Sequence, residues 1–407
     1  MAGRNDYIAS IDIGTDKIAV LVAEKKDDDR LRIIGHNICP SDGVRKGSIS
    51  AIDSLSRAIS KALDQTQKSF DLEIGLVRVN LSDTHLTCID GNGKIPINEI
   101  VTSDDVDKVL ASASAITTPT NKEKLHTIKK KFIINGDHIV DNPEDMKAEV
   151  LESKVHIVTV SSASVRNIES CLKQCDLMVD RIVLDPIANA EAILTQEEKD
   201  GGVCLIDFGA GVTSYSVFQE EGIVRSGVIS MGGDDITQEI ALAFDTSLEE
   251  AKRLKEDYGC AKSSTMKDEK FVEFVQANKK ESHQLSSLQL SEVIEEAYVD
   301  ILSILKNELR HHNLEANIKS GFVLCGGGAQ ALGCDELVRE FFTRRVKIGA
   351  VQRDRISGLE TILMDYRYAS SIGLLLHQED LPQVDFIMSN GRNGVIGKIS
   401  KVFLGHF

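Results

Sequence analysis

Residues 7–24 read YIASIDIGTDKIAVLVAE, and residues 203–219 read VCLIDFGAGVTSYSVFQ. Each stretch is an apolar strand that ends in an aspartate, followed by a glycine-containing turn and a second strand that leaves the turn. The recurrence of one such β-hairpin far along the chain indicates an internal duplication of a supersecondary unit. The duplicated turn is therefore the first place to look for chemistry.

The two turns have the composition of a phosphate-binding site. Backbone N–H groups of a tight turn cradle phosphate oxygens, and a neighbouring carboxylate holds a hydrated Mg²⁺ ion. Glycine is needed because a Cβ atom would keep the backbone from approaching the ligand. We expect Asp12 and Asp207 to share one magnesium ion through water. The expected phosphate contacts are Asp12, Gly14, Thr15 and Lys17 in the first turn and Asp207, Gly209, Gly211 and Thr213 in the second.

A third glycine turn follows the two hairpins. The buried strand GFVLC, residues 321–325, runs into Gly326, Gly327 and Gly328. A D-x-G-T turn taken alone is also typical of an ordinary hairpin with no ligand. Two matching hairpins followed by a triple-glycine turn favour a nucleotide site, in which the third turn lies flat against an adenine ring.

The motifs and their order resemble those of the superfamily of actin, sugar kinases and seventy-kilodalton heat-shock chaperones. Within it the chain is most similar to the FtsA family of bacterial division proteins. The segments that carry this resemblance are IDIGTDKIAVLVAE, IDFGAGVTSYSV, ISMGGDDITQEIALAF, VLCGGGAQALG and YRYASSIGLLL. The resemblance implies an α/β, actin-like fold with two ribonuclease-H-like domains around a nucleotide cleft and an inserted α+β subdomain. It also implies ATP and Mg²⁺ as ligands, with Gly232, Gly233 and Lys255 near the phosphates and ribose and Gly326, Gly327 and Gly328 near the adenosine.

The chain departs from the family pattern at two places. FtsA-like chains usually have a second turn close to D-I-G-G-G-T-T-D. This chain has Ala210, Val212 and Ser214 in that turn, so an acidic group and a hydroxyl group are missing. Lys252 stands where the family commonly has a glutamate, whereas Lys255 is retained. Both departures bear on nucleotide affinity and base preference.

The expected domain organisation follows from the same landmarks. The ranges are 1–81 and 162–200 for actin-like domain 1, 82–161 for the inserted subdomain, 201–233 and 316–365 for actin-like domain 2, 234–315 for a helical subdomain of domain 2, 366–377 for the return to domain 1, 378–390 for a linker and 391–407 for an amphipathic helix.

Apolar periodicity predicts several helices. They span residues 51–65, 104–116 (with Thr102 or Ser103 as the N-cap), 165–175, 234–244, 248–258 and 291–311. The polar stretch 261–289 is interpreted as a mobile connection. We interpret Asp185 as a turn residue before Pro186, which leaves the chain without an assigned catalytic group. Slow ATP hydrolysis or none is the resulting expectation.

Composition limits the classes of protein that remain. The 407 residues are 42% hydrophobic and 27% charged, which is typical of a globular protein of more than one core. The formal charge of −16 argues against nucleic acid as a partner. The N-terminus has no signal-peptide pattern, and no run of 18 apolar residues predicts a spanning helix. The eight scattered cysteines are typical of reduced thiols in the cytosol.

The last segment predicts a helix that lies on a membrane. Residues 391–407 contain no acidic residue, and in this acidic chain we expect them to form the one local basic surface. Two alternatives stay open, because the segment could instead pack on its own protein or lack regular structure. The expected membrane-contacting residues, apolar on one face and cationic beside it, are Val395, Ile396, Lys398, Ile399, Lys401, Val402, Phe403 and Phe407.

The resemblance also implies partners. It points to the C-terminal peptide of the tubulin-like ring protein FtsZ, docked near the helix at residues 291–311, to self-assembly into filaments, to an anionic membrane surface and to other division proteins. The location implied is the cytoplasmic face of the inner membrane at the septum. The family typically has an arginine where this chain has Ala297. A small-molecule kinase and a pilus-assembly scaffold of the same superfamily remain as alternatives.

Overall fold

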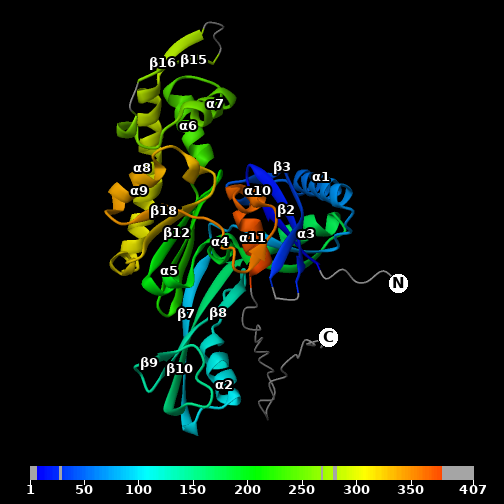
Figure 1. The fold of residues 1–407 in the computed structure, drawn as a ribbon, viewed down its shortest axis with the longest axis vertical. Coiled ribbons are helices and arrows are strands. Elements are labelled where there is room, and N and C mark those ends of the chain that lie inside the picture. Colours follow the sequence, from blue (N-terminus) through cyan, green and yellow to red (C-terminus); the bar gives the residue numbers. More distant parts are fainter. Residues whose placement is uncertain (1–6, 27–29, 267–268, 278–281, 378–407) are drawn as a thin grey trace. The chain divides into compact units, whose positions relative to one another are not determined.

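The computed structural model describes residues 7–26, 30–266, 269–277 and 282–377. These residues form two compact units, one made of residues 7–87 and 160–377 and the other of residues 88–159 (Figure 1). The expected linker at 378–390 and the expected helix at 391–407 lie outside the described residues. None of the described helices is both long and apolar enough to cross a membrane.

The larger unit begins with a six-stranded sheet, the first sheet. Its order is β11-β6-β1-β2-β3-β19. Strands β1 and β2 form the expected hairpin, with Tyr7 opposite Glu24 and Ile13 opposite Ile18. Strands β6 and β11 then pair parallel beyond β1, so the carboxyl ends of three strands meet at one edge. The bounds are β1 Tyr7–Ile13, β2 Lys17–Lys25, β3 Leu31–Pro40, β6 Leu76–Leu81, β11 Met178–Leu184 and β19 Ile356–Ser357, with the short hairpin β4 Val44–Arg45 and β5 Ser48–Ile49 nearby.

The second sheet repeats this plan. Its order is β14-β13-β12-β17-β18, with β12 and β13 antiparallel and β12 and β17 parallel. In both hairpins the glycine after the aspartate closes the turn, since Gly14 N donates to Lys17 O at 2.9 Å and Gly209 N donates to Val212 O at 3.0 Å. The duplication is thus confirmed in the hydrogen-bond pattern. The bounds are β12 Val203–Phe208, β13 Thr213–Gln219, β14 Gly222–Ile229, β17 Gly321–Cys325 and β18 Val346–Ile348.

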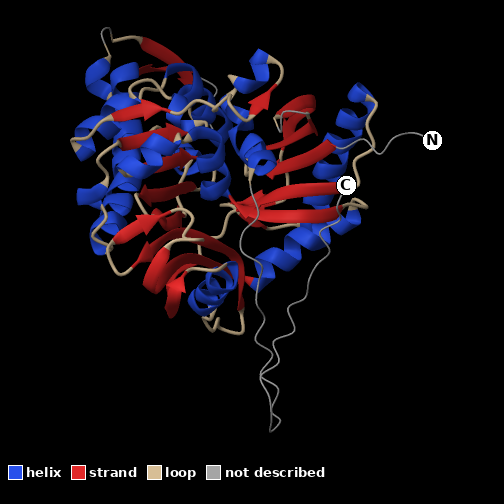
Figure 2. Cartoon of the chain, turned by 60° about the horizontal axis from the view of Figure 1, so that its bottom comes forward, coloured by secondary structure: helices blue, strands red, loops and turns tan. Residues whose placement is uncertain are grey.

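Helices cover the sheets of the larger unit (Figure 2). Helix α4 follows β11 of the first sheet yet packs under the second, where Ser216 Oγ donates to Pro186 O at 3.1 Å. Helix α11 packs on the first sheet, where Ser10 Oγ donates to Ser371 O at 2.9 Å. The two helices touch at Gly373, where any Cβ atom would overlap Ala188 O. The bounds are α1 Ile52–Phe70, α3 Ser162–Gln174, α4 Asp185–Ile193, α5 Gln196–Gly201, α9 Cys334–Phe342, α10 Glu360–Leu363 and α11 Ala369–Leu376.

The helical subdomain consists of α6 (Gly233–Ala243), α7 (Leu248–Tyr258), α8 (Ser287–His311) and a hairpin of β15 (Phe271–Val275) and β16 (Ser282–Ser286). Its core continues that of the second sheet through side chains such as Ile236, Leu254 and Ile301. The prediction of a mobile connection at 261–289 was wrong for its described part. Val272, Phe274 and Leu285 are buried, and this alternation was hidden among polar neighbours.

The smaller unit is a four-stranded sheet of order β7-β10-β8-β9 with one helix, α2 (Ser103–Ser114). Its own core contains Val109, Phe132 and Leu151. Thr102 is the N-cap of α2, as predicted, and forms a capping box with Asp105. The strands are β7 Thr87–Ile100, β8 Lys122–Ile134, β9 His138–Val140 and β10 Lys147–Ser161.

A second basic surface corrects the expectation that the terminal segment would be the only one. It lies at the end of the second sheet, where Arg344, Arg345 and Lys347 are exposed on and before β18. Arg344 and Arg345 lie in the connection between α9 and β18, and Lys347 lies on β18 itself.

Candidate functional site

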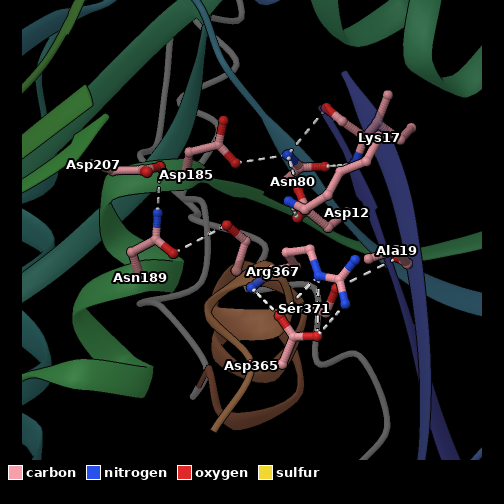
Figure 3. Close-up of polar contacts among 12 residues, drawn as sticks. Asp12, Lys17, Ala19, Asn80, Asp185, Asn189, Asp207, Asp365, Arg367 and Ser371 are labelled. Atoms are coloured by element: carbon pink, nitrogen blue, oxygen red, sulfur yellow. Dashed lines mark hydrogen bonds and ion pairs between the residues drawn. The ribbon is translucent and has the colours of Figure 1, made fainter. Parts of the chain in front are cut away.

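A cleft of about 1100 Å³ lies in the larger unit. The first hairpin turn, the second hairpin turn and the third glycine turn all line it, together with residues of α6 and α7. Figure 3 shows the polar side chains at its centre, where Asp12, Asp185 and Asp207 face one another from three different elements. The sequence predicted the convergence of the three turns but not the presence of Asp185 among them.

In the first turn, Asp12 ends a strand whose interior is fully buried, and its side chain is 7% exposed. Asn80 Nδ2 donates to Asp12 Oδ1 at 2.8 Å, and Lys17 Nζ lies 3.7 Å from Oδ2. Asn80 Oδ1 accepts from Ile13 N at 2.6 Å, which fixes the turn to β6. Gly14, Thr15 and Lys17 also line the cleft, as predicted.

In the second turn, Asp207 Oδ2 accepts from Asn189 Nδ2 at 2.9 Å. Gly209 and Gly211 line the cleft, as the sequence predicted. Thr213 does not line it, because its side chain is fully buried and its Oγ1 donates to Met231 O at 2.9 Å. Successive side chains of a strand point to opposite faces, so the neighbouring Ser214 reaches the cleft instead.

The third turn packs against the second. Gly326 has φ +84°, and a Cβ atom there would overlap both Asp207 Oδ1 and Phe208 O. Only glycine satisfies both the conformation and the close approach. Gly327 is open to the cleft, since the nearest heavy atom to an added Cβ is Tyr366 Cε2 at 3.8 Å. Gly328 O accepts from Tyr298 Oη of α8 at 2.8 Å, which joins the turn to the helical subdomain.

Asp185 corrects an interpretation made from the sequence. Rather than a mere turn residue before Pro186, it is the first residue of α4 and lines the cleft. Asn80 Nδ2 donates to its Oδ1 at 2.7 Å, and Ser82 Oγ donates to Oδ2. The missed signal was topological, because β1, β6 and β11 are parallel neighbours and their carboxyl ends place Asp12, Asn80 and Asp185 together.

The cleft holds more negative charge than its own cations neutralise. Burial raises the pKa of Asp12, of Asp207 to about 6 and of Asp185 to about 7, and mutual repulsion among the carboxylates adds to the last two. Lys17 is the cation that lowers the pKa of Asp12 and Asp207. Within the described residues no three His, Cys, Asp or Glu side chains are grouped tightly enough to hold a metal ion by themselves. This arrangement of carboxylates fits a hydrated divalent cation that also contacts phosphate.

The helical subdomain contributes the other side of the cleft. Gly233 and Lys255 line it, and Lys255 Nζ donates to Gly233 O at 2.7 Å and to Thr237 Oγ1 at 2.8 Å. Burial lowers the pKa of Lys255, and the nearby carboxylate of Asp234 acts in the opposite direction. Gly232 is not among the cleft-lining residues. It caps α6, and a Cβ atom there would press on Gly209 O at 2.7 Å, so it supports the second turn from behind.

Two ion pairs join the helical subdomain to the rest of the larger unit, one at the turn between β1 and β2 and one at the turn between β4 and β5. Lys252 Nζ lies 2.7 Å from Asp16 Oδ1, and Lys46 Nζ lies 2.8 Å from Asp235 Oδ1. The hydrogen bond that Lys252 Nζ donates to Asp16 Oδ1 raises the pKa of Lys252. The lysine that replaces the family's usual acid is therefore already paired with a carboxylate of the first turn.

Two similar hairpin sheets around a cleft, with helices on their faces, define an actin-like protein. The solved structure described as "PilM-PilN type IV pilus biogenesis complex" superposes with a TM-score of 0.61 at 15% identity, covering 91% of this chain and 97% of that chain. MreB5 of Spiroplasma citri bound to ADP superposes with a TM-score of 0.54 at 12% identity, covering 91% and 94%. These similarities establish the fold.

Sequence comparison shows which family of actin-like proteins the chain is similar to. The family described as "Cell division protein FtsA" matches residues 204–373, and the "SHS2 domain inserted in FTSA" matches residues 84–159. FtsA of Pseudomonas aeruginosa is 32% identical over 371 residues, which cover 91% of this chain and 88% of that protein. FtsA of Escherichia coli K12 is 30% identical over 376 residues, covering 90% and 89%. The chain belongs to the FtsA family of bacterial cell division proteins.

Proposed function

We propose that the cleft binds ATP with Mg²⁺. The observation that carries this proposal is the trio of carboxylates facing three glycine turns, because a cation bound among them with its anionic ligand relieves their mutual repulsion. Gly14, Thr15, Lys17, Gly209, Gly211 and Gly233 would meet the phosphates. Asp12 and Asp207 would hold the magnesium ion through water. Gly326, Gly327 and Gly328 would lie against the adenosine, with Lys255 beside the ribose and phosphates.

Isothermal titration calorimetry tests this step. ATP is titrated into the full chain in a buffer with an about 5-fold excess of Mg²⁺ over ATP. We expect a measurable heat of binding, and we expect EDTA to weaken the binding. An Asp12→Ala, Asp207→Ala double variant that retains its melting temperature should bind at least about 100-fold more weakly. Absence of any binding heat in the wild-type chain, checked by equilibrium dialysis with radiolabelled ATP, overturns the proposal.

We further propose that the protein polymerises and tethers the division ring to the cytoplasmic face of the inner membrane at the septum. Family membership supports this role, and the apolar and cationic pattern of 391–407 supports attachment through an amphipathic helix. One such helix binds weakly, whereas a filament that presents many gains avidity. Deleting 391–407 should abolish co-sedimentation with vesicles of phosphatidylglycerol. Equal pelleting of both forms contradicts the tether.

The ring-protein partner we propose is the C-terminal peptide of FtsZ, docked on the helical subdomain. Ala297 is 4% exposed, so this position of α8 cannot contact a peptide. The subdomain does expose large apolar side chains near the start of α7 and on β15: Leu242, Leu248, Phe271 and Val275. We expect Leu248→Glu to weaken binding of an FtsZ tail peptide, measured by fluorescence anisotropy. Ile304→Glu, which changes an exposed apolar residue of α8, serves as the control.

The alternatives are now less well supported. The likeness to the pilus complex rests on 15% identity, whereas 30–32% identity over about nine-tenths of the chain links it to division proteins. Family membership gives no support to a small-molecule kinase. We propose that any hydrolysis is slow, with Asp185 as the group to test.

A further inference from the structure

The basic surface at the end of the second sheet contains a groove of about 640 Å³. Four cations line it, namely Arg339, Arg344, Arg345 and Lys347. Lys347 pairs with Glu198 at 2.5 Å, and Arg339 pairs with Asp335 at 2.9 Å. Within the described part of the chain, the guanidinium groups of Arg344 and Arg345 have no ion-pair or hydrogen-bond partner. The groove therefore presents two unneutralised positive charges in a chain of formal charge −16.

The backbone beside these charges is also unoccupied. Strand β18 is the last strand of its sheet and pairs only with β17 on its inner side among the described residues (Figure 1). The outer side of an edge strand presents N–H and C=O groups that an extended segment can pair with. Ile348 on this strand is 41% exposed. The groove thus combines an open strand edge with cations, which fits an extended acidic segment.

The chain itself contains a segment of matching charge. Residues 378–390, QEDLPQVDFIMSN, carry Glu379, Asp380 and Asp385 and no lysine or arginine. They begin directly after the last described residue, His377. Their charge is opposite in sign to that of the groove.

The distance can be spanned. Arg355 donates through its guanidinium to Leu376 O at the end of α11, and Arg355 is only the seventh residue after Ile348, the end of β18. Seven residues extend over at most about 25 Å, whereas the 13 residues of 378–390 extend over about 43 Å. The segment is long enough to reach the groove and run along it.

We propose that the acidic segment 378–390 docks in the groove beside β18, with its carboxylates at Arg344 and Arg345 and its backbone along the open strand edge. This inference stands apart from the proposed function, because neither nucleotide nor membrane enters it. Docking of 378–390 fixes where the following residues 391–407 leave the protein body. A covalent tether supplies a high local concentration, so weak ion pairs suffice.

Hydrogen–deuterium exchange of the full chain tests the proposal. Amides of 378–390 and of β18 should exchange roughly tenfold more slowly in the wild-type chain than in an Arg344→Glu, Arg345→Glu variant, given two ion pairs and a short ladder. Raising the salt concentration to 1 M should remove most of the difference, since the Debye length falls to about 3 Å. Equal exchange in both proteins overturns the proposal.

Three further variants make the test specific. Lys61→Glu with Lys68→Glu is the matched control, because it reverses two exposed charges on α1 and should leave the exchange unchanged. Glu379→Gln, Asp380→Asn, Asp385→Asn should release the segment while leaving the groove intact. Replacing the same three acids by lysine in the Arg344→Glu, Arg345→Glu background should restore protection, and failure to restore it overturns the charge pairing. Protection that grows with protein concentration assigns the groove to a second copy and also overturns the proposal.

Discussion

The two hairpins of the cleft share one backbone plan but differ in charge. In each hairpin an aspartate is the penultimate residue of the first strand, and each turn is closed by a glycine N–H bond of nearly equal length, 2.9 and 3.0 Å. Asp12 has Lys17 beside it and an amide donor from Asn80. Asp207 has the amide of Asn189, while Val212 occupies the position in its hairpin that Lys17 occupies in the first. Lys17 lowers the pKa of both aspartates, but only the first hairpin supplies this cation from its own residues.

The largest expected effect comes from the support that only the second hairpin has. Gly326→Ala forces a Cβ atom against Asp207 and Phe208 O at a residue with φ +84°. We expect ATP affinity to fall by at least about 100-fold, or about 2.7 kcal/mol, because the carboxylate must move. Gly327→Ala, which meets nothing closer than 3.8 Å, is the control for calorimetry. Equal losses in both variants contradict this account of the third turn.

Removing one carboxylate at a time tests the charge difference directly. Asp207→Asn should cost about 30-fold in affinity with Mg²⁺ present, because the metal loses a partner that no lysine replaces. Asp12→Asn should cost less than about tenfold, since the freed Lys17 can neutralise phosphate itself. In EDTA, Asp12→Asn should bind ATP more tightly than the wild-type chain. The comparison between the hairpins fails if the two variants behave alike in both buffers.

The stability of the ligand-free protein should depend on pH through the same carboxylates. The pKa values of Asp185, about 7, and Asp207, about 6, lie above their ordinary range. The stabilisation they provide is complete below pH about 4 and is lost as pH rises through 6 to 7. Asp185→Asn should therefore stabilise the protein at pH 8 by roughly 1–2 kcal/mol and change little at pH 4.5. Denaturant titrations at both pH values measure this, and a gain of the same size at pH 4.5 would show a cause other than charge.

The smallest effect is expected at the ion pairs that join the helical subdomain to the rest of the larger unit. Lys252 and Asp16 are 46% and 57% exposed in their side chains, so the pair is screened by solvent. Lys252→Ala should change ATP affinity by no more than about threefold. Lys46→Ala, which removes the pair with Asp235, is the companion variant. A change above tenfold in Lys252→Ala alone would mean that Lys252 contacts the nucleotide directly.

The sequence predicted the parts of the site that are local. A strand, an aspartate and a glycine turn are adjacent in the chain, so Asp12, Asp207 and Gly326 could be assigned without a structure. Asn80 and Asp185 were missed because parallel strand pairing, a long-range feature, brings them together. Thr213 was misassigned because the strand begins at that residue and alternation then points it inward. The hairpin of β15 and β16 was missed because each strand has only five residues and both lie within a polar stretch of sequence.

The contact between α4 and α11 at Gly373 sets how the two sheets can move. Backbone meets backbone there, so neither helix can approach the other, and a larger side chain would wedge them apart. Opening and closing of the cleft would therefore be a rolling motion about this point, with Gly373 and Ala188 as the fulcrum. A small rotation at such a pivot becomes a large displacement at the far ends of the sheets.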